Sequence, residues 1–189
     1  MNPTKSILTI IAATLVSATP LLAQQKKVNS TGGTSPHETT SAVIDGNRVT
    51  ITYGRPFTKH PRTGEPRKIW GGLVPWDKAW RTGSDEATLL VTQQPIVIGD
   101  TTIPAGAYTL YAVPSESGVS KLAFGTKLGG WGVPVDEKND LARVDMKKEA
   151  LDEPVHQFTM AVAKNPAGGG LIKLMWEDTQ FTVPFTVKK

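Results

Sequence analysis

The side chains best suited to ligand chemistry gather in one stretch, Lys68–Thr88, with the sequence KIWGGLVPWDKAWRTGSDEAT. It holds three of the five tryptophans of the chain, and an arginine and two acids follow the last of them. Tryptophan rings stack on flat ligands such as sugars, while guanidinium and carboxylate groups hydrogen-bond to polar ligand atoms. The stretch therefore predicts either a stacking platform for a small molecule or an apolar plug that packs on the core.

Pro75 favours a single helical turn over residues 75–81, because the N–H that proline lacks would be unpaired there anyway. Such a turn would put Trp76 and Trp80 at positions i and i+4 on one face, with Arg81 at its edge. We expect Trp80 and Arg81 to be largely buried and Trp76 to be the more exposed ring.

Tyr53 and Arg55 lie at the end of the preceding extended segment, and we expect them at the rim of the same site. The candidate ligand-binding set is therefore Tyr53, Arg55, Trp70, Trp76, Trp80, Arg81, Asp85 and Glu86. We expect its ligand to be a carbohydrate or another small molecule.

Acid/base hydrolysis is the alternative chemistry. A glycosidase needs two carboxyl groups ~5–10 Å apart across a cleft, whereas adjacent acids on an extended chain point to opposite faces. Such a pair would therefore join Glu38 or Asp136 to Asp85 or Glu86, with His156 as a further acid/base candidate. Nothing in the sequence singles out one pair.

Metal, cofactor and nucleic-acid binding are not favoured. The three histidines, His37, His60 and His156, are far apart in the sequence, and no phosphate-binding loop or nucleophile elbow is present. The absence of cysteine excludes disulfides and thiolate metal ligands. The net charge of +4 comes from scattered bases, whereas a nucleic-acid footprint needs them gathered on one face.

The N-terminal segment has the pattern of a targeting sequence. Residues 1–23 combine an early lysine, an apolar run and a small residue before Gln24, which is typical of a secretory signal peptide. We expect residues 24–36 to form a flexible leader and residues 37–189 a single domain. No run is long enough for a comfortable membrane span. A periplasmic or secreted, soluble protein is predicted.

Apolar residues alternate with polar ones through most of the remaining chain. Asp45-Gly46 between the alternating segments 39–44 and 48–53 is a strong hairpin signal. Further strands are predicted at 87–92, 96–98, 101–103, 107–113, 119–124, 141–147, 157–162, 171–176 and 180–187. We predict an all-β fold, an antiparallel β-sandwich with the jelly roll as one topology. The predicted core contains Ile51, Leu110, Phe158, Met160, Leu174, Phe181 and Phe185.

A set of short motifs spread over residues 35–184 carries a family resemblance. In chain order they are Ser35-Pro36-His37, Tyr53-Gly54-Arg55-Pro56, Arg67-Lys68-Ile69-Trp70-Gly71, Val74-Pro75, Trp80-Arg81-Thr82-Gly83, Glu86-Ala87-Thr88, Pro104–Tyr108, Trp176-Glu177 and Val183-Pro184. Together they resemble the exported bacterial proteins of domain-of-unknown-function family twenty-nine eleven. The resemblance implies export and a β-rich fold but no activity.

Two departures from the family pattern stand out. Residues 60–66 look like an insertion, and Ser84-Asp85 replaces an expected Ala-Asn. Because position 85 is an aspartate in this chain, any role of a side-chain amide at that position in the family is not expected here.

Overall fold

The computed structural model describes residues 26–28 and 35–188, so the expected signal peptide lies outside the described residues. The described chain is mostly β-strand, with one short 3-10 turn, η1 (Glu137–Asn139). The strands are β1 (Lys26–Val28), β2 (His37–Ile44), β3 (Asn47–Gly54), β4 (Thr88–Thr92), β5 (Ile96–Ile98), β6 (Thr101–Ile103), β7 (Gly106–Val113), β8 (Ser120–Gly125), β9 (Asp140–Lys164) and β10 (Gly170–Val187).

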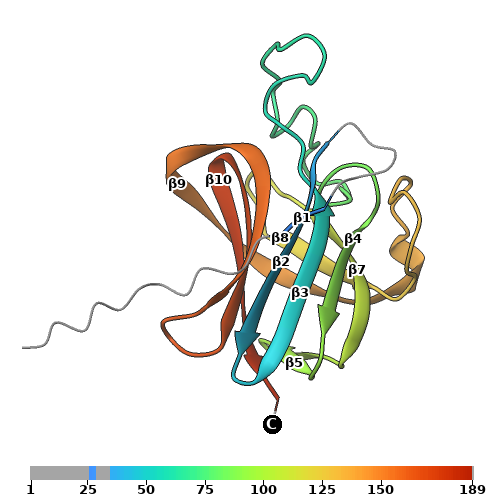
Figure 1. The fold of residues 1–189 in the computed structure, drawn as a ribbon, viewed down its shortest axis with the longest axis vertical. Coiled ribbons are helices and arrows are strands. Elements are labelled where there is room, and N and C mark those ends of the chain that lie inside the picture. The colour runs from blue at the N-terminus through green and yellow to red at the C-terminus, as the bar shows by residue number, and fades with distance from the viewer. Residues whose placement is uncertain (1–25, 29–34, 189) are drawn as a thin grey trace, which may run out of the picture.

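All strand pairs are antiparallel, and hydrogen bonds join them into one sheet of order β1-β2-β3-β4-β7-β8-β9-β10-β5-β6. The long strands β9 and β10 bend away from the part of the sheet that is formed by β2, β3, β4, β7 and β8 (Figure 1). The residues just after β3 meet β9, since the Phe158 amide donates to the Pro56 carbonyl at 2.9 Å. The all-β antiparallel class is confirmed, but the two separate sheets of a sandwich are not seen among the described residues.

The predicted hairpins form where the turn residues indicated. Asp45 and Gly46 both have positive φ, 48° and 85°, as a two-residue hairpin turn of type I′ requires. The second hairpin joins β5 and β6 with the predicted bounds. Local turn chemistry therefore sufficed to place these connections.

Two connections and the leader differ from the prediction. The strands predicted at 141–147 and 157–162 are parts of one strand, β9, and β10 runs through Glu177, where a turn was expected. Glu177 has a φ of 51°, and the β9–β10 register shifts on both sides of it. A β-bulge of this kind bends a strand without releasing it from the sheet. The leader is also partly ordered, because β1 pairs with β2.

The predicted core is confirmed. All seven residues named above are at most 2% exposed, and they belong to one apolar cluster with side chains from β2 to β10. Alternation identified them because successive side chains of a strand point to opposite faces. Trp176 is fully buried in the same cluster.

Candidate functional site

The tryptophan loop packs onto the core through a chain of aromatic contacts. Trp70 stacks on Trp76, with ring centroids 5.8 Å apart, and Trp80 stacks on Trp176 at 6.0 Å. Trp70 also meets Trp80 edge-on at 6.1 Å and links the two pairs. Such contacts add ~0.5–1.5 kcal/mol each beyond the apolar burial. The loop is therefore anchored as a plug, as one of the two interpretations predicted.

The helical turn expected over residues 75–81 is wrong. Asp77 has a φ of 57°, and Trp80 pairs with Ala112 of β7 through two backbone hydrogen bonds of 2.8 and 2.9 Å. This extended pairing satisfies backbone groups that a helical turn would leave unpaired. As a result Trp76 stacks on Trp70 and Trp80 stacks on Trp176, so the two rings do not form one shared face. Both rings, like Arg81, are partly buried, and the greater exposure of Trp76 stays a prediction.

A tight turn after Trp80 positions the polar residues. Thr82 and Asp85 have φ values of 57° and 63°, and the Thr82 carbonyl accepts a 2.6 Å hydrogen bond from the Thr88 hydroxyl. The turn lies directly on Gly54, where an added Cβ would be 2.1 Å from the Ser84 carbonyl oxygen. A glycine at position 54 therefore lets the turn dock on the end of β3.

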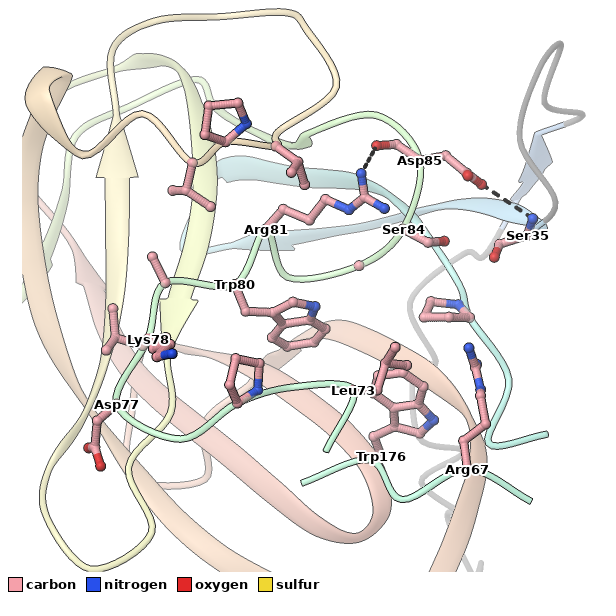
Figure 2. Close-up of a pocket in the computed structure, with 18 of the residues that line it drawn as sticks. Ser35, Arg67, Leu73, Asp77, Lys78, Trp80, Arg81, Ser84, Asp85 and Trp176 are labelled. Atoms are coloured by element: carbon pink, nitrogen blue, oxygen red, sulfur yellow. Dashed lines mark hydrogen bonds between the residues drawn. The ribbon is translucent and has the colours of Figure 1, made fainter. Parts of the chain in front are cut away.

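A cleft of about 890 Å³ opens beside this turn, and Figure 2 shows its lining. Trp80 contributes aromatic surface, with the fully buried Trp176 stacked behind it, and Phe57, Leu73 and Val133 are apolar residues that are themselves 41–63% exposed. The charged side chains of the lining are Arg67, Asp77, Lys78, Arg81, Asp85, Glu137 and Arg143. The cleft thus combines apolar and polar lining in similar measure, so a ligand here would need both a flat apolar part and polar groups.

Arg81 is held at the wall by backbone oxygens. Its Nη1 donates to the carbonyls of Asp85 and Trp131 at 2.8 and 2.9 Å. The carboxylate of Asp85 points the other way and accepts from the Ser35 amide at 3.2 Å (Figure 2). Partial burial lowers the pKa of Arg81, although the nearby acids Asp85 and Glu86 oppose that shift.

Tyr53 and Arg55 lie outside the lining of the cleft. Arg55 forms an ion pair with Glu38, whose side chain is 4% exposed, and donates to the Phe158 carbonyl at 3.1 Å. The Tyr53 hydroxyl accepts from the Met160 amide at 2.8 Å, and burial raises its pKa. These residues join β2, β3 and β9 into a buried polar network.

Of the other predicted site residues, some line the cleft and some do not. Trp80, Arg81 and Asp85 line the cleft, whereas Trp70 and Trp76 lie outside its lining. Glu86 is half-exposed, and its Oε2 lies 2.6 Å from Nε2 of the buried His37. A hydrogen bond from its own backbone amide is the largest cause that lowers the pKa of Glu86, and His37 adds to it.

Sequence reasoning missed an ionic network at the edge of the cleft. The Tyr111 hydroxyl donates to Asp140 at 2.5 Å, and Arg143 bridges Asp140 and Glu137 at 2.6 and 2.7 Å. Burial and the Asp140 carboxylate raise the pKa of Tyr111. Trp176 and Arg67 were also missed as lining residues. The alternation of side chains along residues 171–176 predicts that Trp176 points inward, but no local signal predicts its contact with Trp80.

The fold and the cleft define an all-β protein with an aromatic-walled depression. The chain belongs to the family described as "Protein of unknown function (DUF2911)", whose model matches residues 35–185. No curated protein and no solved structure matches the chain significantly.

The described residues hold neither a metal-binding cluster nor a membrane-spanning helix. Within 26–28 and 35–188, no three histidine or acidic side chains come together as a group that could hold a metal ion. No helix in that part of the chain is long and apolar enough to cross a membrane.

Proposed function

We propose that this protein binds a small organic molecule in the cleft beside Trp80. The observation that carries the proposal is the cleft itself, whose volume of about 890 Å³ is in the range of ligand sites. One face of Trp80 is stacked on Trp176, and the remainder of the ring contributes to the lining. A partly exposed tryptophan held in this way offers a rigid surface to a sugar ring or an aromatic ring.

Binding is favoured over hydrolysis by the positions of the acids. Glu38 is engaged by Arg55, and Glu86 lies against His37, both outside the lining. Asp136 is held by Lys127 and Asn139, which lower its pKa. A general acid needs a raised pKa, so neither Glu86 nor Asp136 has the property that a glycosidase acid requires.

The ligand site can be tested with a panel of monosaccharides and small aromatic compounds, followed by tryptophan fluorescence and calorimetry. Trp80→Ala is expected to weaken binding of a stacked ligand by ~1–3 kcal/mol. Val43→Ala is the control, because Val43 is 46% exposed on β2 and does not line this cleft. The proposal fails if no compound binds below ~10 mM, an affinity of ~3 kcal/mol, or if Val43→Ala weakens binding as much as Trp80→Ala does.

We also propose export from the cytoplasm, on the basis of the charged, apolar and small-residue order of residues 1–23. N-terminal sequencing of the protein from its native host should then begin at or near Gln24. An intact Met1 on the cytoplasmic protein would refute export.

A further inference from the structure

Arg67 and Arg81 line the cleft, and neither forms an ion pair with a carboxylate of the described residues, unlike Arg55 and Arg143. Arg55 pairs with Glu38, and Arg143 pairs with Glu137 and Asp140. Arg67 and Arg81 form no ion pair with any carboxylate among the described residues, which include all 17 acidic side chains of the chain.

Both guanidinium groups are nevertheless held in place. Arg81 uses Nη1 for two backbone carbonyls, and Arg67 donates from Nη2 to the Phe57 carbonyl. The buried Nε of Arg67 has no acceptor among the described residues. Carbonyl oxygens orient a guanidinium but carry no full negative charge, so the positive charges of both residues remain uncompensated by direct contact.

The acids that line the same cleft are engaged elsewhere. The Asp85 carboxylate accepts from the Ser35 amide, the Asp77 carboxylate from the Ser115 hydroxyl at 2.5 Å, and Glu137 pairs with Arg143. Desolvation lowers the pKa values of Arg67 and Arg81, which is the effect that a bound anion would reverse. Positive groups and an aromatic wall therefore share one depression.

We infer that the ligand is an organic anion, with a carboxylate that binds at Arg81 and a flat body that packs against Trp80, while Arg67 adds a second positive charge to the lining of the same cleft. This inference rests on the proposed function, because it assigns the chemical class of the molecule in the same cleft. A planar guanidinium matches a carboxylate in bidentate geometry, and a partly dehydrated site strengthens that contact. Acidic sugars and aromatic acids both have this combination of a flat face and a carboxylate.

The test uses two matched pairs of probes, galacturonate with galactose and indole-3-acetate with indole-3-acetamide. Calorimetry on the wild-type protein should show at least one acid bound about 10-fold tighter than its neutral partner. Arg81→Met should reduce that ratio to about 3-fold or less, and Arg67→Met should reduce it in the same direction. Arg48→Met removes an equal charge from an exposed position of β3 and should leave the ratio unchanged.

The outcomes separate this inference from the proposed function. If neutral and acidic probes bind equally and Trp80→Ala weakens both, the cleft binds ligands but the anion assignment is overturned. If none of the four probes binds, the anion assignment is overturned, and the proposed function is overturned as well only if the panel of monosaccharides and aromatic compounds also fails to bind. Should Arg81→Met fail to fold, Arg81→Lys keeps the charge but loses the planar fork, and an unchanged ratio in both Arg81→Lys and Arg67→Met would overturn the assignment.

Discussion

Replacement of Phe158 by alanine is expected to lower the free energy of unfolding by ~3–5 kcal/mol. The Phe158 ring is fully buried and meets Trp80 at 5.0 Å, Trp176 at 5.6 Å and Tyr53 at 5.7 Å between ring centroids. The truncation would leave a cavity beneath both tryptophans that line the cleft. Urea titration followed by circular dichroism measures the loss.

Phe57→Ala is the control for this prediction, because Phe57 is 41% exposed and its truncation creates no closed cavity. Its expected cost is below ~1 kcal/mol. A loss below ~1 kcal/mol for Phe158→Ala would mean that the inward face of β9 has been wrongly assigned. If the cleft binds a ligand, Phe158→Ala should also weaken binding, since Phe158 supports Trp80 without lining the cleft.

Glu38→Ala is expected to have a comparable effect, again ~3–5 kcal/mol, through electrostatics instead of packing. The Glu38 side chain is 4% exposed and pairs with Arg55, whose side chain is 18% exposed. Removal of the carboxylate leaves the guanidinium in a largely dehydrated place, with the Phe158 carbonyl and the Thr159 hydroxyl as its remaining partners. An unpaired charge of this kind costs more than a neutral hydrogen-bonding group.

The exposed pair between Lys121 and Asp145 provides the comparison. Their side chains are 41% and 67% exposed, so Asp145→Ala should cost less than ~1 kcal/mol. The double variant Glu38→Met with Arg55→Met should recover part of the loss seen in Glu38→Ala, because it removes both charges. Equal costs for Glu38→Ala and Asp145→Ala would show that the buried network contributes little.

The predictions from the sequence agree with the structure where a feature depends on residues close together in the chain. They differ from it where a feature depends on residues far apart. The Asp45-Gly46 turn and the core positions Ile51 and Phe158 depend on neighbouring residues and on the two-residue period of a strand. These features were predicted correctly. The continuity of β10 through Glu177 was not, because a bulge depends on the partner strand as well as on the local sequence.

The candidate site was predicted less completely for the same reason. Trp80, Arg81 and Asp85 reach the cleft, but Arg55 is drawn into the core by Glu38, which lies 17 positions earlier in the sequence. Trp176 joins the cleft from β10, nearly 100 positions after Trp80. Neither partnership has a local signal that a sequence could present.

The sequence by itself determined the strand faces, the hairpin turns and the family, because each depends on residue type at short spacing. Only the tertiary structure decided that Trp80 would pair with Ala112 instead of forming a helical turn. It also decided which arginines have carboxylate partners, Arg55 and Arg143, and which do not, Arg67 and Arg81. The physical reason is that backbone hydrogen bonds and ion pairs between distant segments outweigh the weak local preference of a few loop residues.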